Sequence, residues 1–479
     1  MTRLSRLLCI VAITVTAGVV TETARLRQAT ATTTPAVSES TVDRVFARWK
    51  QDTPGCAVGV GVGGASVLQK AYGRADLEHD VRNTPDTIFE AGSVAKQFTA
   101  AAVLLLSKEG KLSLDDPVRK YVPELPEYGS ALLIRHMLNH TSGLRDWGEV
   151  AAIAGWARTT RVHTHAHVLD IVSRQHSLNF TPGSQYSYSN SGYNLAAIIV
   201  SRVSGKTFAE FSQERLFKPL GMTHTSWRDD FTRIVRNRAI AYSEGRDGQF
   251  QMDMPFENVH GNGGLLTTVG DLLKWNENFV SPKVGDLAFV REQQETGRFN
   301  DGRPQQYALG LVIGQYRGVR NVSHSGATAG YRAYLVRYPD QHVSVAVLCN
   351  VSSGTATQYA QAVADMYLGS ALKAGPQAPA APQPGPKDTF HPTAKELGAF
   401  AGTYSSDEAE TTFVAAMDGE TLVLKRRPDT VLKLRPTTTD TFAAQPLGIV
   451  KFLRDTAGRV NGMSVSRDRV FDMRFTRTQ

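Results

Sequence analysis

Apolar and polar residues alternate along two separate parts of the chain, at the period of two that a half-buried β-strand requires. In the later part, turn residues divide the pattern into four predicted strands, at 307–316, 319–324, 331–338 and 343–349. In the earlier part, strands are predicted at about 55–63 and 66–73, and Gly63-Gly64 between them is typical of a hairpin turn.

Between these strands lie the longer apolar runs that are typical of buried helices. Residues 97–106 and 194–200 form two such runs, each followed by a glycine that can end a helix. A further helix is predicted from Val42 onward. Strands at both ends with helices between them predict an α+β fold, in which one antiparallel sheet is built from both chain ends and helices pack against it. We place this domain at residues 42–372.

A second, all-β region is predicted at the C-terminus. Residues 373–393 contain six prolines and are predicted to form a semi-stiff linker. Short strand-like runs and turns follow, at about 411–417, 421–425, 431–434, 449–453 and 470–476. We therefore predict a small β-barrel or sandwich over residues 394–479.

The first residues resemble a targeting segment. Arg3 and Arg6 precede an apolar run at 7–20, which is shorter than the roughly 20 residues of a membrane span. We predict a signal peptide over 1–31, a tether over 32–41, and a secreted or periplasmic protein. An uncleaved N-terminal anchor is the alternative, and no other membrane span is expected.

Composition is ordinary for a soluble protein of 479 residues, with 41% hydrophobic and 20% charged residues. The net charge of +8 becomes +5 without the signal peptide, which carries four arginines and one glutamate. No dense basic run is present, so a nucleic-acid partner is not expected. Cys56 and Cys349 remain, both in predicted strands; an exported protein could oxidise them, and two buried free thiols are the alternative.

Ser93 and Lys96 are the first candidates for chemistry. They lie three residues apart at the start of a predicted helix, which places both side chains on one face. The ammonium or amine of Lys96 can help remove the hydroxyl proton, and free N–H groups at the helix start favour an oxyanion. The same spacing recurs at Ser370 and Lys373, beside the proline-rich linker, so context must decide between the two copies.

Two further short motifs supply the partners that a serine nucleophile needs. Tyr188 is followed two residues later by Asn190; a nearby Lys96 would favour the tyrosine anion, and the amide suits gripping a substrate. His324-Ser325-Gly326 ends a predicted strand, and its glycine would let a substrate lie against the strand edge. Ala327 could then add a second oxyanion N–H donor to that of Ser93.

In this order, the three motifs resemble those of the penicillin-recognising serine hydrolases: class C β-lactamases, D-alanyl-D-alanine carboxypeptidases, D-aminopeptidases and related esterases. Stretches at 138–144, 218–222 and 263–268 are also similar to that family, and the resemblance covers about 42–370. The region after residue 397 resembles the lipocalin-like β-domain appended to some of these enzymes.

The resemblance implies roles for the candidate residues. Ser93 is the nucleophile, Lys96 and Tyr188 share proton transfer, and the N–H groups of Ser93 and Ala327 form the oxyanion hole. The residues expected to bind substrate are Asn190, His324, Ser325 and Gly326. No cofactor or metal is required by this chemistry.

One departure bears on substrate choice. Typical β-lactamases carry Lys-Thr-Gly where this chain has His324-Ser325-Gly326, and a histidine is largely neutral at pH 7. We expect an exported serine hydrolase that acts on amide or ester bonds of peptides with D-residues or related esters, with β-lactam hydrolysis less favoured. The alternative is a penicillin-binding or sensor protein that acylates and stalls.

Other features give weaker expectations. His163, His165 and His167 alternate, and a helix would point them apart, so no zinc site is predicted. The partner is expected to be a small-molecule or peptide substrate. The oligomeric state is left open, and the C-terminal barrel is expected to shape the active-site entrance or oligomer contacts, with binding of a small apolar ligand as the weaker alternative.

Overall fold

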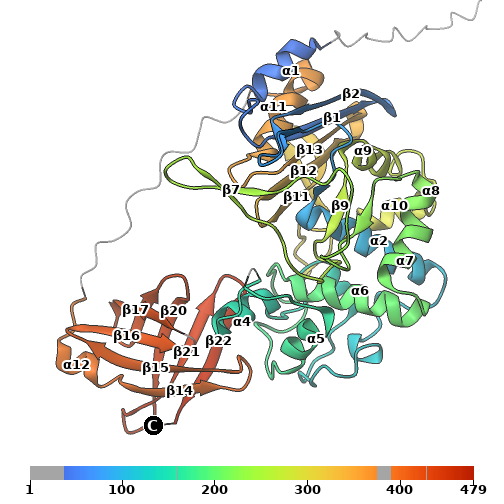
Figure 1. Cartoon of the computed structure of the whole chain (residues 1–479). Helices are drawn as coiled ribbons and strands as arrows, with labels where there is room; N and C mark the ends of the chain where they lie inside the picture. The colour runs from blue at the N-terminus through green and yellow to red at the C-terminus, as the bar shows by residue number, and fades with distance from the viewer. Residues whose placement is uncertain (1–36, 159, 375–389, 428, 479) are drawn as a thin grey trace, which may run out of the picture. The chain divides into compact units, whose positions relative to one another are not determined.

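The computed structural model describes residues 37–158, 160–374, 390–427 and 429–478 (Figure 1). Its main sheet has six antiparallel strands in the order β10-β11-β12-β13-β1-β2. These are β1 (Cys56–Val62), β2 (Ala65–Tyr72), β10 (Val312–Tyr316), β11 (Val319–Thr328), β12 (Tyr331–Tyr338) and β13 (Val343–Cys349). The two ends of the domain meet where β1 pairs with β13, which confirms the predicted α+β fold.

Strand bounds differ from the prediction at the edge that matters for function. β12 and β13 have the predicted bounds, whereas β10 begins at Val312. β11 continues past His324 to Thr328, because residues 324–328 stay paired with β12 instead of turning at Gly326. β10 pairs with β11 only as far as Ser323, so the edge of β11 beyond that residue is not covered by β10.

Helices cover both faces of the sheet. On one face lie α1 (Glu39–Val45) and α11 (Ala356–Leu368); on the other lie α2 (Lys96–Lys108) and α9 (Val269–Glu277) (Figure 1). A hydrophobic core lies on each face of the sheet, and alternate residues of β12 point into one or the other. Tyr334, Val336 and Tyr338 belong to the core with α11, and Tyr331, Ala333 and Leu335 belong to the core with α2 and α9. α1 begins at Glu39, three residues before the predicted start.

The remaining elements of this domain are short except for α6, which has 15 residues and includes the predicted helical run at 194–200. The helices are α3 (Ile134–Leu138), α4 (Trp147–Ala154), α5 (His165–Ser173), α6 (Asn190–Ser204), α7 (Phe208–Ser212), α8 (Lys218–Leu220) and α10 (Leu287–Gln293). The strands are β3 (Arg74–Asp76), β4 (Val81–Arg82), β5 (Phe89–Glu90), β6 (Ser226–Trp227), β7 (Tyr242–Glu244), β8 (Phe250–Met252) and β9 (Leu265–Thr267). No helix among the described residues is long and apolar enough to cross a bilayer.

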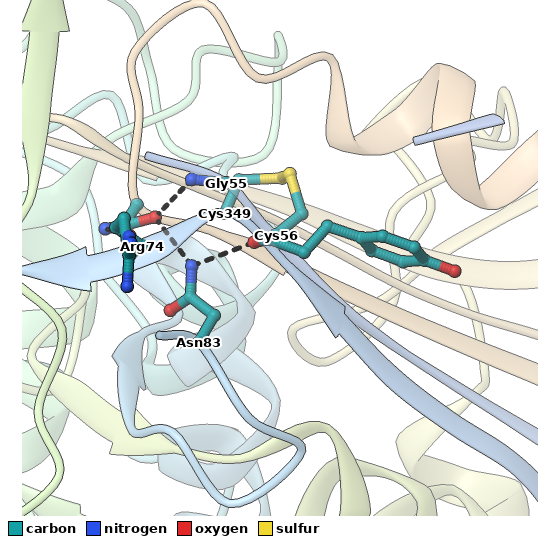
Figure 2. The surroundings of a disulfide bond; sticks show 7 residues. Gly55, Cys56, Arg74, Asn83 and Cys349 are labelled. Carbon is teal, nitrogen blue, oxygen red and sulfur yellow. Dashed lines mark hydrogen bonds between the residues drawn. A yellow bond between two sulfur atoms is a disulfide. The ribbon is translucent and has the colours of Figure 1, made fainter. Parts of the chain in front are cut away.

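A disulfide joins Cys56 and Cys349, which lie directly opposite each other on β1 and β13 (Figure 2). The side chain of Asn350 also links the ends of these two strands, because its Oδ1 accepts a hydrogen bond of 2.8 Å from the Gly55 N–H. The bonded pair excludes the alternative of two free thiols in this structure. It ties together two strands that are 293 residues apart in sequence.

The C-terminal region is a nearly closed barrel of nine antiparallel strands in the order β17-β16-β15-β14-β22-β21-β20-β19-β18, preceded by α12 (Ala394–Gly398). The strands are β14 (Gly402–Ser406), β15 (Thr411–Asp418), β16 (Thr421–Arg426), β17 (Thr430–Lys433), β18 (Arg435–Thr438), β19 (Thr441–Ala444), β20 (Gly448–Arg454), β21 (Val460–Arg467) and β22 (Val470–Arg477). Stacked Phe400 and Phe452 form part of its core. The predicted signal peptide and most of the predicted linker lie outside the described residues.

Candidate active site

Ser93 and Lys96 lie where a 3₁₀ turn, η1 (Gly92–Ala95), runs directly into α2. Lys96 Nζ is 3.1 Å from Ser93 Oγ, so the motif makes the contact that its spacing predicts. The other copy of the motif, Ser370 and Lys373, borders the linker at the surface and has no such surroundings. The structure therefore favours Ser93 as the nucleophile.

Lys96 is completely buried and surrounded by oxygen acceptors. Besides Ser93, its Nζ donates to Asn190 Oδ1 at 2.8 Å and to the Asn262 carbonyl at 2.7 Å. Burial lowers the pKa of Lys96 well below its ordinary value, because the charged form loses its hydration. A neutral Lys96 amine has a free lone pair and can accept the proton of the Ser93 hydroxyl.

Tyr188 packs beside this pair. Lys96 Nζ lies 4.7 Å from the centre of the Tyr188 ring, over its face, and the ring of His140 packs against it with centroids 4.2 Å apart. Burial raises the pKa of Tyr188, an effect that the hydrogen bond with Ser93 only partly offsets. Burial therefore disfavours the expected tyrosine anion in the free protein, and the amine of Lys96 is better suited to act as base.

Two glycines allow β11 to approach the nucleophile. A Cβ on Gly326 would lie 2.0 Å from the Ala91 carbonyl oxygen, and a Cβ on Gly92 would lie 2.6 Å from Ala327 N. Any larger residue at either position would push β11 and the turn apart. The close approach places the backbone of Ala327 beside the turn that carries Ser93, as the predicted oxyanion hole requires.

His324 is held inside the site rather than presented at its surface. Its Nε2 lies 2.8 Å from the Tyr307 hydroxyl and its Nδ1 lies 2.6 Å from the Ser325 carbonyl oxygen. Burial, reinforced by the nearby charge of Lys96, lowers the pKa of His324 to about 3. The imidazole is therefore neutral at pH 7, which confirms the expectation that this position attracts anions less than a lysine would.

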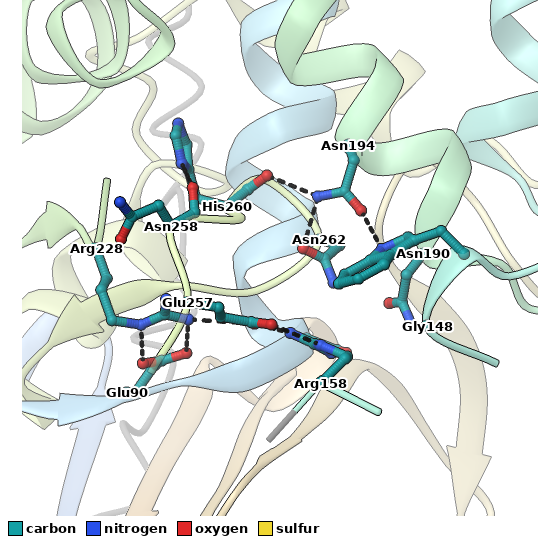
Figure 3. A network of polar contacts seen from close by, with 12 residues as sticks. Glu90, Gly148, Arg158, Asn190, Asn194, Arg228, Glu257, Asn258, His260 and Asn262 are labelled. Atoms are coloured by element: carbon teal, nitrogen blue, oxygen red, sulfur yellow. Dashed lines mark hydrogen bonds and ion pairs between the residues drawn. The ribbon is translucent and has the colours of Figure 1, made fainter. Parts of the chain in front are cut away.

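A polar network fixes the acceptors around Lys96, and Figure 3 shows the part of it formed by Asn194 and Asn262. Asn190 donates its backbone N–H and its side-chain Nδ2 to Asp146 Oδ2, both at 2.8 Å, which leaves its Oδ1 for Lys96. Asn194 Nδ2 donates to Asn262 Oδ1 at 2.8 Å and thereby orients the loop whose carbonyl binds Lys96. Both amide atoms of Asn190 are thus engaged within the protein, and its predicted contact with substrate stays a prediction.

Sequence reasoning missed several of these residues. Asp146 could have been found as the N-cap of α4, since its side chain accepts from Gly148 and Glu149. Asn262 sits in a glycine-rich loop with no motif to mark it. Of the three alternating histidines, His163 and His167 pack edge to face with ring centroids 6.0 Å apart, whereas His165 lies apart against His260 and its carbonyl.

Ser93 opens into a cavity of about 540 Å³ that is rich in arginine. Tyr188, Asn190 and the His324–Ala327 edge line it together with Arg158, Arg332 and Arg469, and no Asp or Glu is among its lining residues in the described chain. Arg158 is held by an ion pair with Glu257, which also faces Arg228 (Figure 3). The cavity therefore combines three arginines in its lining with two nearby carboxylates outside it, Glu257 beside Arg158 and Asp146 beside Arg469.

Arg469 comes from the barrel, at the turn between β21 and β22. Its guanidinium lies 4.8 Å from the centre of the Tyr188 ring and 4.0 Å from the carboxylate of Asp146. The Arg469 carbonyl accepts a hydrogen bond of 3.0 Å from Asn179 Nδ2, and Arg145 forms an ion pair of 3.0 Å with Glu408 of the barrel. These contacts support the expectation that the barrel shapes the active-site entrance.

An α+β fold that brings Ser93, Lys96 and Tyr188 together beside a glycine-containing strand edge defines a class, the serine hydrolases that work through an acyl-enzyme. Comparison with known families places the chain within it. The family described as Beta-lactamase matches residues 41–367, more than half of the chain, and the protein belongs to this family.

Among the curated relatives of this chain are proteins named D-aminopeptidase and a protein named penicillin-binding protein 4*. A D-aminopeptidase of Gluconobacter oxydans is 28% identical over 311 residues, 65% of this chain and 58% of the relative. Penicillin-binding protein 4* of Bacillus subtilis is 28% identical over 327 residues, 63% of this chain and 68% of the relative. The chain thus spans less than two thirds of the D-aminopeptidase that it matches.

Solved structures confirm the fold. The octameric penicillin-binding protein homologue from Pyrococcus abyssi aligns with a TM-score of 0.61 and 23% identity, over 91% of this chain and 98% of that one. A D-amino acid amidase from Ochrobactrum anthropi SV3 aligns with a TM-score of 0.59 and 22% identity, over 69% and 97%. These alignments show that the chain has the fold of the β-lactamase family.

Proposed function

We propose that the protein hydrolyses amide bonds of substrates with a D-amino-acid residue, through an acyl-enzyme on Ser93. The observation that carries this proposal is the contact between a buried Lys96 amine and Ser93 Oγ at 3.1 Å. Relatives named D-aminopeptidase and D-amino acid amidase support the choice of substrate class. Related esters are also expected to react, because an ester carbonyl is attacked in the same way.

The geometry suggests how the residues share the chemistry. The neutral Lys96 amine takes the proton of Ser93 as Oγ attacks the substrate carbonyl carbon. The resulting oxyanion is bound by the N–H groups of Ser93 and Ala327. The leaving amine takes a proton from Tyr188 or Lys96, which the network around Asn190 keeps in place. Water then hydrolyses the acyl-enzyme, with the same groups acting in reverse.

The charge of the cavity adds a specificity proposal. Its lining among the described residues has Arg158, Arg332 and Arg469 but no carboxylate, although Glu257 and Asp146 lie behind two of these arginines. A substrate with a negative charge therefore gains attraction, chiefly from Arg332, whereas a free α-ammonium group has no acidic partner in the lining. We propose that N-acylated or carboxylate-bearing D-substrates are preferred to those with a free amino terminus.

The function is tested with matched pairs of D- and L-residue amides, each with a free and an acetylated amino group. We expect turnover of the D-series, loss of turnover in Ser93→Ala, and a mass increase on Ser93 alone when wild-type protein is trapped with substrate. Turnover that persists in Ser93→Ala overturns the proposal. A stable adduct with a penicillin and no steady-state turnover of any amide would favour the sensor alternative.

We also propose that the protein is exported. The disulfide between Cys56 and Cys349 supports this, because such bonds persist in oxidising compartments. Expression in a host with an export pathway, followed by N-terminal sequencing of the mature protein, tests it: a cytoplasmic protein that keeps residue 1 and free thiols would contradict it.

A further inference from the structure

A second cavity, of about 410 Å³, lies away from Ser93 between the main sheet and the C-terminal end of α9. One row of residues across four strands lines its floor: Arg337 on β12, Ser344 on β13, Gly61 on β1 and Ser66 on β2, each opposite the next in register. Leu273 and Glu277 of α9 line it from the other side.

Arg337 is the unusual member of this row. Alternation along β12 places Tyr331, Ala333 and Leu335 on the α9 face, so the next position on that face would be expected to be apolar. Arg337 is instead a guanidinium that is 3% exposed. A buried cation is retained in proteins when it is paired with an acceptor, so its partners need to be identified.

Among the described residues, the side chain of Arg337 forms no hydrogen bond or ion pair. Its contact is with the ring of Phe279, whose centroid lies 3.6 Å from the guanidinium carbon, and its buried Nη2 has no acceptor. The neighbouring charge that acts on it is Arg320, which is repulsive, and burial together with this charge lowers the pKa of Arg337 to about 9. The ring contact leaves the planar N–H donors of the guanidinium unused.

The other charges of the cavity indicate what kind of acceptor fits. Asp271 is occupied by the His224 N–H at 2.8 Å, the Thr225 hydroxyl at 2.9 Å and Lys274 Nζ at 2.8 Å. Exposed Asp86 and Glu277, which faces Gly64, also line the cavity. These carboxylates disfavour a multiply charged anion such as phosphate and leave a partner for an ammonium group. Leu273 and Val343 can contact an apolar body.

We infer that this cavity binds a small carboxylate of the size of an amino acid, with the carboxylate in a bidentate hydrogen bond to Arg337 and the apolar body against Leu273 and Val343. A planar guanidinium matches a carboxylate in this geometry better than a lysine does. The ligand class includes free amino acids and simple organic acids. The inference is independent of the proposed function, since none of these residues lines the Ser93 cavity.

Isothermal titration of the whole protein with D-alanine, L-alanine, propionate and inorganic phosphate tests the inference. We expect at least one carboxylate to bind, and Arg337→Met to weaken that binding by roughly tenfold or more, the loss of a charge-assisted hydrogen bond. Arg303→Met, which removes an exposed arginine of the same charge, is the matched control and should bind as wild type does. If an alanine binds more tightly than propionate and Glu277→Gln removes that difference, the ligand class is free amino acids. Equal binding of alanine and propionate indicates simple organic acids.

Several results would overturn the inference. They are binding of phosphate alone, no binding of any carboxylate, and carboxylate binding that Arg337→Met leaves unchanged. If Arg337→Met does not fold, crystals of wild-type protein soaked in the tightest carboxylate decide the matter. Density on the Arg337 guanidinium supports the inference, and density only at Ser93 refutes it.

Discussion

Lys96 and Arg337 are two buried cations of the same domain with opposite surroundings. Lys96 Nζ lies within hydrogen-bond distance of three oxygen atoms, those of Ser93, Asn190 and Asn262. The Arg337 guanidinium instead lies against the ring of Phe279 and, among the described residues, its buried Nη2 has no acceptor. Burial lowers the pKa of both groups. The difference teaches that a lowered pKa does not identify a catalytic base, because the acceptors around the group decide what it can do.

The consequence differs for each residue. Lysine can lose its proton within an accessible pH range, so burial favours the neutral amine of Lys96, whose Nζ already lies 3.1 Å from the hydroxyl oxygen of Ser93. Arginine has no lone pair to offer as a base and keeps its donors even when buried. The first arrangement suits proton transfer and the second suits recognition of an anion.

The largest expected effect comes from removing the base. Lys96→Ala should lower kcat/KM by about 10³-fold or more, because Ser93 loses its proton acceptor while the oxyanion donors remain. Steady-state hydrolysis of a D-residue amide measures this. Circular dichroism should show that the fold persists.

Lys96→Arg sharpens the same test. A guanidinium keeps the positive charge but cannot act as a base, so we expect activity as low as in Lys96→Ala. A variant that retains substantial activity would show that charge, not proton transfer, is the role of Lys96. In wild-type protein, activity should be present above the lowered pKa of Lys96 and be lost as the pH falls through it. His324, with a pKa of about 3, adds no step between about pH 5 and 8.

The sequence predicted the reacting groups better than the groups that hold them. Ser93, Lys96, Tyr188 and His324 stand in short motifs whose spacing reflects local geometry, so they could be found from the chain alone. Asn262 and Arg337 could not, because their surroundings arise from segments that are far apart in sequence and meet only in the fold.

The strands, too, could be predicted only where the pattern of their own residues is long and regular. Long alternating runs such as β12 and β13 were predicted at their observed bounds. In the barrel, β14, β18, β19 and β21 were missed: the first three have only four or five residues each, and Gly462, Ser464 and Ser466 give β21 the composition of a loop. Their pairing partners, rather than their own pattern, determine that they are strands.

The next effect concerns stability. Arg337→Met should raise the free energy of unfolding by about 1–4 kcal/mol in carboxylate-free buffer, since it removes an unpaired buried charge and keeps the apolar volume. Burial lowers the pKa of Arg337, so the charged form is disfavoured in the folded protein although the guanidinium keeps its proton. Urea denaturation at pH 7 measures the change in stability. Arg303→Met should change stability by less than about 0.5 kcal/mol, and a destabilised Arg337→Met would show that the guanidinium has an internal partner.

A smaller effect is expected when Lys96 loses one of its oxygen acceptors and thereby becomes more similar to the unpaired Arg337. Asn190→Ala removes one of the three acceptors of Lys96 and leaves Asp146 without the Nδ2 donor. An unsatisfied buried group of this kind costs about 1–3 kcal/mol, so kcat/KM should fall by roughly 10- to 100-fold. Because the amine also loses an orienting contact, kcat should fall more than KM rises. A change confined to KM would instead support the predicted role of Asn190 in holding substrate.

The smallest expected effect lies at the strand edge. Tyr307→Phe removes the hydrogen bond of 2.8 Å to His324 Nε2 and leaves the ring packing intact. The loss of one neutral hydrogen bond is worth about 0.5–1.5 kcal/mol, which corresponds to a fall in kcat/KM of a few-fold to about tenfold. The pH profile should keep its shape, because burial rather than Tyr307 is the first cause of the low pKa of His324. A new titration near pH 6.5 in this variant would show that the tyrosine, and not burial, keeps the imidazole neutral.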